Sequence, residues 1–576
     1  MNTDSRTREF VTSLSHQRID RHVLQHFPLP VQTALAVYLI SALPRFFQTR
    51  SYKIIADEID VITKETIHRP TDSDDETNGF PVEELDVEET IVLEENDPKV
   101  LRTLLTGIPS PSSLFWSFIT ALINLALVLM VWDLTYTGKL FHESHDLSLA
   151  RVGYVSDKTA KVLIREPKSA EYPLFLSYRY ADKPMEGYRA QDTSWKSAGT
   201  ILHLDNTTDF TGVFDITGLR PDTRYEYVAS NNHTGLFTTA PQVGHTSPRK
   251  DDVFTFLHSS CIKPNFPYVP FRHALSMPGF KTLSKLLPKL NAQFMLFLGD
   301  FIYIDVPHRF GTDIETYRRE YRQVYASPDW ASVSSDAGAE LPWIHVYDDH
   351  EIANDWDRNE TGVYRSAVDP WQHYQASVNP PPVRFNASYF SFVQGPASFF
   401  MIDTRRYRDP FDGTNGTWNA ENGQQKSMLG KEQREDLLAW LARREPHGVR
   451  WKVMVTSIPF TKNWRFGSED TWAGYLGERQ VILEAMWDVG LEGGVGVVVL
   501  SGDRHEFAAT AFPPPAEGKV VGLDIGYAGQ GLHQGLKTKH WPLSATVHEF
   551  STSPLSMFYL PVRTYRQDDE EDVCIK

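Results

Sequence analysis

Metal-capable residues recur in the second half of the chain, each group directly after an apolar run with the composition of a β-strand. Continuous apolar runs separated by helical stretches are typical of strands buried on both faces, and such sheets bind ligands outside the carboxyl ends of their strands. We therefore expect these donors to meet at one edge and to form a multi-metal site. The runs are Val253–Leu257 before His258–Cys261, Gln293–Leu298 before Gly299–Asp305, Trp343–Tyr347 before Asp348–Glu351, Ser398–Ile402 before Asp403–Arg405, Lys452–Thr456 before Ser457, and Val495–Leu500 before Ser501–His505.

The donor types indicate which cations would fit. Asp300 and Tyr303 can place a carboxylate and a phenolate beside one cation, and phenolate is a hard ligand suited to a trivalent metal. Taken alone, such a pair is more often explained by structural hydrogen bonding. Cys261 alone would be a small buried hydrophobic residue, and only its place after a predicted strand makes it a candidate ligand.

Two further motifs add carboxylates and imidazoles. Asp349 and His350 follow a predicted strand, and the adjacent Asp348 and Asp349 carboxylates repel each other unless a cation neutralises them. Asp503 and His505 project the same way from an extended segment. A metal-free strand end and a catalytically idle turn are the structural alternatives. Metal-dependent hydrolysis of phosphate esters needs cations roughly 3.5–4 Å apart, with ligands from several loops, which this spread of donors would supply.

Layered elements are predicted to position these donors. Residues 251–562 alternate the apolar runs with helical segments such as Gly430–Arg444, where Leu437, Leu438 and Leu441 recur at helical spacing. Strand, helix and strand in alternation predict a layered α/β core. The Pro- and Trp-rich stretches 365–385 and 406–425 are predicted loops.

Residues 149–241 have the pattern of an all-β sandwich, with short alternating runs separated by turn residues. The stretch Leu219–Tyr227 resembles the fibronectin type III corner, in which a tyrosine hydroxyl ties a strand to a preceding turn. An irregular stalk is the alternative. The predicted strands are Thr159–Arg165, Leu174–Tyr180, Thr211–Ile216, Arg224–Val228 and Gly235–Thr239.

An uncharged run, Leu114–Trp132, is long enough at about 1.5 Å per residue to cross the hydrocarbon core of a membrane. We predict a transmembrane helix over 114–134. A buried core helix is the alternative, although helices of soluble proteins usually keep a polar face. A second apolar segment, 28–47, is short and interrupted by prolines, so it would either span the membrane or lie in its interface. Neither resembles a cleavable signal sequence.

Basic residues predict the orientation of these segments. Arg45, Arg50 and Lys53 follow the first segment and Lys99 and Arg102 precede the second, which places the loop between them in the cytosol. One span and two spans both remain open, and in either case the large C-terminal region would be lumenal or extracellular. Five N-x-[ST] sequons lie in that region as predicted glycosylation sites: Asn206, Asn232, Asn359, Asn386 and Asn415.

The composition of the chain bears on its number of domains, its binding partners and its disulfides. At 576 residues the chain exceeds one ordinary core, so several domains are expected. The net charge of −17 is concentrated in residues 48–113, which hold 16 Asp and Glu against 6 Lys and Arg and which we predict to be a disordered loop. The rest lacks the clustered positive charge of a nucleic-acid-binding surface. With Cys261 and Cys574 as the two cysteines, a structural disulfide is not expected.

Taken together, residues 150–560 resemble the PhoD family of alkaline phosphatases, a branch of the metallophosphoesterases. The resemblance implies a four-layer α/β/β/α catalytic domain that hydrolyses phosphate esters. The membrane segments fit a membrane-anchored eukaryotic member of the fungal type and differ from exported, soluble bacterial members. The motifs that carry the resemblance are Ser259–Cys261, Gly299–Asp305, Asp348–Asp355, Asp403–Arg408, Met428–Gln433, Asp470–Tyr475 with Glu478 and Arg479, Ser501–Phe507 and His548–Pro554.

The resemblance also implies a role for each candidate residue. Cys261, Asp300 and Tyr303 would hold Fe³⁺, with Asp300 also facing a second site. The cluster would be completed with Ca²⁺, and thiolate, phenolate and extra carboxylates favour iron with calcium over two zinc or manganese ions. The implied metal ligands are Cys261, Asp300, Tyr303, Asp349, Asp503 and His505.

Two implied catalytic residues complete the expectation. His350 would donate a proton to the leaving group, and Arg405 would hold a phosphate oxygen bidentately. A metal-activated hydroxide would attack phosphorus directly, with no covalent enzyme intermediate. A non-enzymatic membrane glycoprotein with a degenerate phosphatase fold is one alternative, and a phosphodiesterase specific for nucleotides or lipid head groups is another. The expected partners are a phosphate-ester substrate and the membrane, with no obligate protein partner.

The predicted organisation has four parts. A membrane-anchoring region, 1–135, contains the possible helix 28–47, the acidic loop 48–113 and the transmembrane helix 114–134. A fibronectin-III-like β-sandwich occupies 149–241, a PhoD-like metallophosphatase domain occupies 251–562, and an acidic tail occupies 563–576.

Overall fold

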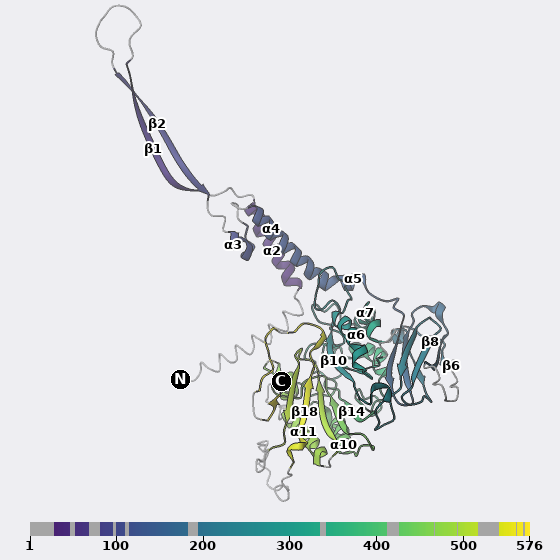
Figure 1. Ribbon diagram of the computed structural model, residues 1–576. Coiled ribbons are helices and arrows are strands. Elements are labelled where there is room, and N and C mark those ends of the chain that lie inside the picture. Colours follow the sequence, from purple (N-terminus) through teal and green to yellow (C-terminus); the bar gives the residue numbers. More distant parts are fainter. Residues whose placement is uncertain are drawn as a thin grey trace, which may run out of the picture. The chain divides into compact units, whose positions relative to one another are not determined.

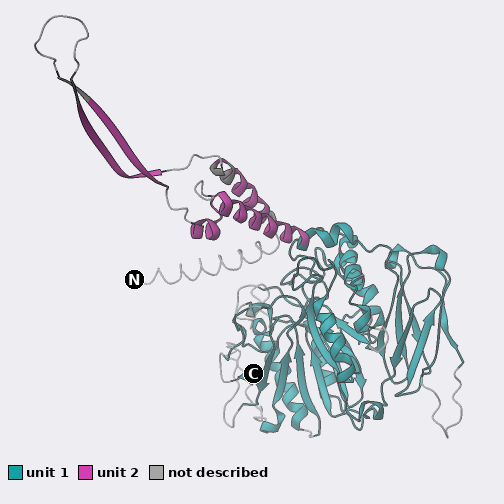
Figure 2. Cartoon of the chain, turned by 45° about the horizontal axis from the view of Figure 1, so that its top comes forward, with its two compact units in different colours: residues 1–26, 134–576 teal, residues 27–133 magenta. Residues whose placement is uncertain are grey.

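The computed structural model (Figure 1) divides the chain into two compact units, one formed by residues 27–133 and the other containing residues 134–576 (Figure 2). The structure describes residues 28–46, 52–67, 81–95, 100–109, 114–181, 194–334, 341–411, 426–465, 467–491, 494–515, 541–559, 561–567 and 571–575.

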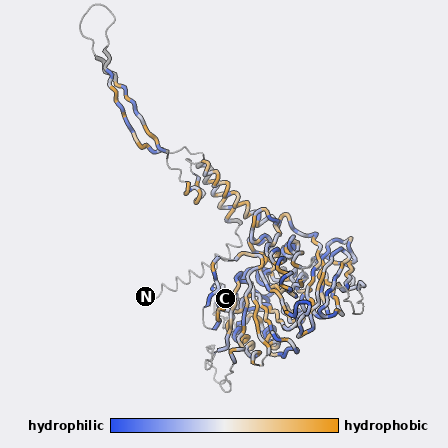
Figure 3. The backbone as a smooth tube through the Cα atoms, in the orientation of Figure 1, coloured by the Kyte–Doolittle hydropathy of each residue, from blue (hydrophilic) through white to orange (hydrophobic). Residues whose placement is uncertain are grey.

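The first unit is built around helix α4 (Leu114–Trp132), whose bounds match the predicted apolar run. Helices α2 (Pro28–Phe46) and α3 (Val100–Thr106) pack against α4. The residues of α4 are almost all apolar, as the colouring by hydropathy shows (Figure 3). As a continuous helix, Leu114–Phe141 is long and apolar enough to cross a membrane.

The acidic segment 48–113 differs from the predicted disordered loop. Strands β1 (Tyr52–Ile67) and β2 (Pro81–Glu95) pair as an antiparallel hairpin. The register sets apolar residues opposite one another, as in Val61 against Val87 and Ile54 against Leu93. Cross-strand pairs of this kind stabilise a sheet. The high content of acidic residues predicted disorder, whereas the apolar residues that recur along both strands allow them to pair.

The second unit begins with a β-sandwich. One sheet has the order β3 (Leu149–Val155), β4 (Ala160–Arg165), β7 (Thr211–Ile216), and the other β6 (Lys196–Ile201), β5 (Leu174–Tyr180), β8 (Arg224–Ala229), β9 (Thr234–Thr238). A buried apolar cluster fills the space between them. The Tyr225 hydroxyl accepts a 2.9 Å hydrogen bond from the Arg220 backbone N–H, which is the corner geometry predicted from the sequence. Strands β3 and β6 were not predicted.

Two further sheets follow in the same unit. The four-stranded sheet has the order β12 (Trp343–Val346), β11 (Met295–Leu298), β10 (Leu257–Ile262), β19 (Pro554–Ser556), and its strands are parallel. The seven-stranded sheet has the order β13 (Phe390–Gln394), β14 (Ala397–Met401), β15 (Trp451–Val455), β16 (Gly496–Ser501), β18 (Val547–Ser551), β17 (Ala508–Phe512), β20 (Val573–Cys574). In it, β14, β15, β16 and β18 are parallel.

Alternation along the strands builds four layers. Leu296 and Leu298 of β11 belong to the apolar cluster between the two sheets, together with Phe399 of β14. Met295 and Phe297 of the same strand point to the opposite face and contact the helices there. Helices α6 (Pro278–Leu290), α7 (Ile314–Tyr325), α8 (Ala331–Ser334) and α9 (Tyr364–Tyr374) cover the four-stranded sheet, and α10 (Gly430–Ala442) and α11 (Leu476–Leu491) cover the seven-stranded sheet. This is the predicted α/β/β/α order of layers.

Short elements connect these layers. A π-helical turn, η1 (Asp133–Thr137), precedes the short helix α5 (Gly138–Phe141). The 3-10 turns are η2 (Ser169–Glu171), η3 (Asn206–Thr208), η4 (Pro248–Lys250), η5 (Ala376–Val378), η6 (Ser468–Asp470), η7 (Trp472–Gly474) and η8 (Leu543–Ala545).

Three sequence predictions need correction in this unit. Strand β10 begins at Leu257, where the predicted strand ended, so the motif ending in Cys261 lies within the strand. The predicted loop 365–385 contains most of α9, which accommodates Pro370. The predicted acidic tail is part of the fold, because β20 pairs with β17 and Asp572 is buried, accepting hydrogen bonds from the Thr461 hydroxyl and the Arg479 guanidinium.

Candidate metal centre

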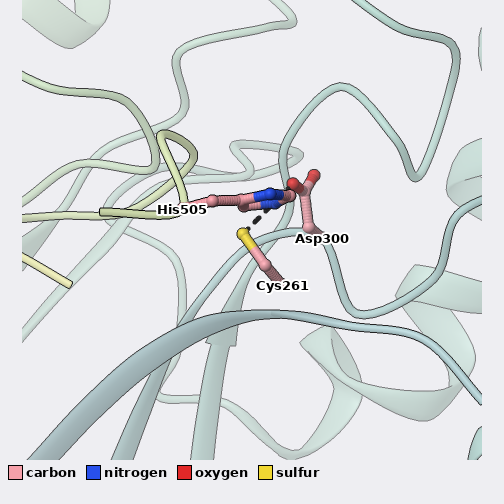
Figure 4. A group of neighbouring side chains, drawn as sticks. All are labelled: Cys261, Asp300 and His505. Carbon is pink, nitrogen blue, oxygen red and sulfur yellow. Dashed lines mark hydrogen bonds between the residues drawn. The ribbon is translucent and has the colours of Figure 1, made fainter. Parts of the chain in front are cut away.

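Donor side chains from both sheets meet beyond the carboxyl ends of their strands. Cys261 lies at the end of β10, Asp300 directly follows β11, and His505 follows β16 of the other sheet. Figure 4 shows these three side chains directed toward one another, and one ligand atom from each lies within 4.8 Å of the others. The structure therefore brings together donors that are separated by more than 200 residues in the sequence.

Tyr303 completes this first group. Its hydroxyl donates a 2.9 Å hydrogen bond to Oδ2 of Asp300 and lies 2.8 Å from Nε2 of His505. The Cys261 thiol lies 3.4 Å from the same Asp300 oxygen. A thiol, a phenol, a carboxylate and an imidazole therefore surround one small volume, and their side chains are buried or nearly so.

A second group of donors shares Asp300 with the first. One carboxylate oxygen from each of Asp300, Asp348, Asp349 and Asp503 lies within 4.8 Å of the others. In all four side chains, one buried oxygen has no hydrogen-bond partner among the residues that the structure describes. Two of these oxygens, on Asp349 and Asp503, lie 3.6 and 3.7 Å from guanidinium nitrogens of Arg405 and Arg504, but none of the four has a hydrogen bond within the described ranges, and buried polar atoms are normally paired. A cation would satisfy all four, and a carboxylate common to both groups suits a site for two neighbouring cations.

The backbone at these donors is held in an uncommon conformation. Cys261, Asp300, Asp503 and His505 have φ values of 60°, 57°, 71° and 57°. Left-handed backbone at non-glycine residues costs roughly 1–3 kcal/mol each and is concentrated at functional sites. At Gly299 a side chain would not fit, because an added Cβ would lie 2.5 Å from Cβ of Asp348.

The protein groups around the centre favour the protonated forms of its acidic side chains. Burial raises the pKa of Asp300 well above its usual value, and neighbouring Asp349 and Asp348 add to this rise. Burial raises the pKa values of the Cys261 thiol and the Tyr303 phenol in the same way, and Asp300 reinforces both shifts. The surrounding protein groups thus do not neutralise the negative charge that these acids would carry when ionised.

The imidazole of His505 shows the opposite shift. Burial lowers the pKa of His505 to about 3, and His350 and Arg504 contribute to the lowering. The ring is therefore neutral at physiological pH, which is the form that binds metals.

His350 is placed differently from His505. Its Nδ1 lies 2.7 Å from the Asp305 carboxylate, and its ring centroid lies 4.2 Å from that of Tyr303. Burial opposes protonation of His350, but the carboxylates of Asp305, Asp349 and Asp300 outweigh it and raise the pKa of the imidazole well above its usual value. A positively charged imidazole beside the donor cluster can act as a proton donor.

Arg405 lies against two carboxylates of the centre. Its side chain is completely buried, and its two terminal nitrogens donate to the Asp470 carboxylate at 2.8 and 3.0 Å. Its Nε donates to Asp348. The planar guanidinium fork therefore contacts carboxylates in this structure, and a bidentate contact of Arg405 with a phosphate oxygen stays a prediction.

Several site residues were missed at the sequence level. Asp348 belongs to the second donor group. Asp355 and Asp470 form a further possible group with Asp349, and His350 forms another with Asp300 and Asp349. Glu351 is buried and accepts hydrogen bonds from the backbone N–H groups of Asp300, Phe301 and Asp348, which fixes two donor loops. These acids stand inside the motifs noted above, but a motif does not reveal which of its carboxylates face the centre.

The centre fits the implied cations by the chemistry of its donors. The group of Cys261, Asp300, Tyr303 and His505 offers one soft and several harder donors suited to iron. The group of Asp300, Asp348, Asp349 and Asp503 offers only carboxylate oxygens, which calcium prefers. The four carboxylate oxygens that lack hydrogen-bond partners in the described part of the chain all belong to members of this second group.

The predicted glycosylation sites lie on the surface where the structure describes them. Asn206, Asn232, Asn359 and Asn386 are exposed. Asn415 lies outside the described residues. The chain's two cysteines, Cys261 and Cys574, are both free.

The chain is similar to known proteins over its C-terminal part. The PhoD-like phosphatase family model matches residues 256–575. Alkaline phosphatase D of Bacillus subtilis (strain 168) is 28% identical over 329 residues, a match that covers 50% of this chain and 52% of that protein. The chain thus matches about half the length of this relative.

Two solved structures are also similar to the chain. A structure of PhoD aligns with a TM-score of 0.48 and 19% identity, covering 71% of this chain and 76% of that one. Purple acid phosphatase PPD1 from yellow lupin (Lupinus luteus) seeds aligns with a TM-score of 0.46 and 14% identity, covering 73% and 67%.

Proposed function

The chain belongs to the PhoD-like phosphatase family, and from this premise we propose that it hydrolyses phosphate esters at the centre around Asp300. The observation that carries the proposal is the cluster of four buried carboxylates, each with one oxygen that lacks a hydrogen-bond partner within the described part of the chain. A thiol, a phenol and an imidazole border this cluster. Metal-dependent hydrolysis of phosphate esters needs such a concentration of cation ligands.

Two kinds of cation are proposed. Cys261, Asp300, Tyr303 and His505 would hold Fe³⁺, and Asp300, Asp348, Asp349 and Asp503 would hold Ca²⁺. When bound, the cations would neutralise charge on the transferring phosphoryl group and lower the pKa of the attacking water. The Asp300 carboxylate would keep the two cations side by side.

The chain's own residues supply proton transfer and rigidity. Asp305 holds Nδ1 of His350 and thereby fixes the ring, so that His350 can protonate the departing alcohol. Arg405 holds Asp348 in place, and Glu351 fixes the backbone on both sides of the centre. These buried contacts keep the donors preorganised, which reduces the reorganisation needed during the reaction.

The setting of the enzyme is also proposed. Helix α4 would anchor a eukaryotic protein of the fungal type in a membrane, with the catalytic domain on the lumenal or extracellular side. Support comes from the length and apolar composition of Leu114–Phe141 and from four exposed sequons in the second unit. The seven-stranded sandwich would be a fibronectin-III-like module, supported by the Tyr225 corner.

Metal analysis and activity together test the proposal. The purified full chain should contain iron and calcium, and it should hydrolyse p-nitrophenyl phosphate or bis-p-nitrophenyl phosphate. The preferred substrate will distinguish a monoesterase from a diesterase. Asp300→Ala and His505→Ala should abolish hydrolysis, whereas Asp215→Ala, at an exposed position of β7, should not. Wild-type turnover in both site variants would exclude this centre as the catalytic site.

A further inference from the structure

A pocket of about 600 Å³ opens beside the metal centre, on the side of His505. His505 lines this pocket and also belongs to the donor group of Cys261 and Asp300. The pocket therefore adjoins the centre at His505. Its volume is in the range of cavities that bind organic ligands of moderate size. We call it the rim pocket.

The wall of the rim pocket is largely apolar. Phe507, Tyr559 and Val562 line it and are 46%, 72% and 62% exposed, and Pro267 and Leu555 also contribute. Contiguous exposed apolar side chains on a protein surface commonly mark a binding site. In this pocket they share a wall with His505, a candidate metal ligand.

The charged residues of the pocket have internal partners. The Glu506 carboxylate accepts hydrogen bonds from the backbone N–H and the hydroxyl of Thr564, both at 2.9 Å. The same carboxylate lies 3.4 Å from Nε of Arg563. Glu506 thus ties the C-terminal segment to the loop after β16 and fixes the wall. Arg504 also lines the pocket and lies 3.7 Å from the Asp503 carboxylate, so the surface offered to a ligand combines the apolar side chains with the Arg504 and Arg563 guanidinium groups.

The same C-terminal segment contacts the metal centre. The Phe558 ring packs edge-on against the His505 ring, with centroids 4.8 Å apart. The apolar wall and a candidate metal ligand are therefore held in one rigid arrangement. A group bound to the wall would have a defined position relative to a phosphate at the centre.

We propose that the rim pocket binds the organic group of the phosphate ester, and that this group is large and apolar, either an alkyl chain or an aromatic ring system. This inference rests on the proposed function and narrows its substrate class. Burial of apolar surface in the pocket would supply binding energy that a short-chain ester lacks. Esters of long-chain or aryl alcohols are therefore the preferred substrates.

Binding of non-hydrolysable phosphonates to the metal-loaded full chain tests the inference separately from catalysis. We expect calorimetry to give an affinity for octylphosphonate at least tenfold higher than for ethylphosphonate. A 2-naphthylphosphonate arm distinguishes an alkyl from an aryl preference, and tighter binding of either compound supports the inference. Equal affinities for all three compounds would overturn it.

A matched pair of variants tests whether the difference in phosphonate affinity arises in the rim pocket. Val562→Asp places a charge in the rim pocket and should reduce the octyl-to-ethyl affinity ratio at least fivefold. Val253→Asp makes the same change at a similarly exposed valine, 56% against 62%, before the opposite end of β10. It should leave the ratio unchanged. Tyr559→Ala, which removes an exposed ring without adding charge, serves as a second pocket variant.

The outcomes separate the inference from the proposed function. If octylphosphonate binds more tightly than ethylphosphonate but neither ethyl nor octyl phosphate is hydrolysed, the pocket assignment stands and the proposed function fails. If both phosphates are hydrolysed with equal kcat/KM and both phosphonates bind equally, the proposed function stands and the pocket assignment fails. An equal loss of the ratio in Val253→Asp would also overturn the assignment to this pocket.

Discussion

The Asp305 carboxylate lies 2.7 Å from Nδ1 of His350, so a buried acid holds the imidazole that adjoins the metal-capable cluster. The second oxygen of Asp305 accepts a hydrogen bond from the backbone N–H of Asn354, which fixes the acid in turn. This pair links the loop after β11 with the loop after β12. The orientation and the charge of His350 therefore depend on a residue outside the donor groups.

Asp305→Asn should lower kcat by about 10- to 100-fold, the usual range for loss of a supporting carboxylate. Removing the carboxylate also lowers the pKa of His350, which Asp305 raises in the wild type. Because the general acid must be protonated, the alkaline fall in kcat should move to lower pH. A pH–rate profile measures both effects. An unchanged profile would contradict this role, and Asp313→Asn, at the N-cap of α7, serves as the control.

Tyr303→Phe should remove the visible absorption band of the iron-loaded protein. A phenolate bound to Fe³⁺ gives a charge-transfer band, and Tyr303 is the tyrosine whose hydroxyl contacts Asp300. The visible spectrum and the iron content should be measured together. Tyr321→Phe is a matched control, because Tyr321 is buried and its hydroxyl has no hydrogen-bond partner within the described ranges. A band that persists in Tyr303→Phe would exclude Tyr303 as an iron ligand.

Metal binding should release protons. In the metal-free protein, burial raises the pKa values of Cys261 and Tyr303, so both groups are protonated at neutral pH. Thiolate and phenolate are the forms that bind metals, so about two protons or more should leave per chain, and affinity should rise with pH. Calorimetry in buffers of different ionisation enthalpy counts the protons. Cys261→Ser should release about one fewer, and a pH-independent affinity would contradict the assignment.

Asp209→Asn should destabilise the second unit by roughly 3 kcal/mol, because removing one partner of a buried ion pair leaves unpaired charge. Asp209 contacts Arg165 of the sandwich at 3.0 Å and Arg322 of α7 at 2.9 Å, and it accepts a hydrogen bond from Tyr374. Thermal or urea unfolding measures the loss. Asp215→Asn, at an exposed position of β7, should change stability by about 0.5 kcal/mol or less.

The ion pairs of Asp209 also predict how the stability of the protein changes at acidic pH. Burial alone would raise the pKa of Asp209, but Arg165 and Arg322 outweigh it and lower the pKa below the usual 3.8. A carboxylate with a lowered folded-state pKa stabilises the protein above its unfolded-state pKa, and this contribution is lost as the pH falls through the folded-state value. The stability difference between wild type and Asp209→Asn should therefore shrink as the pH falls below 3.8. A constant difference would contradict the ion-pair role.

The sequence alone determined the local features of the chain. The uncharged run predicted a helix over 114–134 where α4 lies, and five strands of the two inner sheets, β11, β12, β14, β15 and β16, were located within one or two positions. It also supplied the donor types, since a thiol, a phenol, acids and imidazoles each follow or end an apolar run. These features depend on short-range patterns, which are visible in the order of residues.

Tertiary structure alone decided how the donors combine. That Asp300 is common to two donor groups, that Asp348 joins the second, and that Arg405 is engaged by Asp470 all follow from loops that meet only in the folded chain. The burial of Asp572 and the pairing of β1 with β2 have the same origin. A motif fixes which side chains are available, but the packing of strand ends fixes which of them share a volume small enough for one ion.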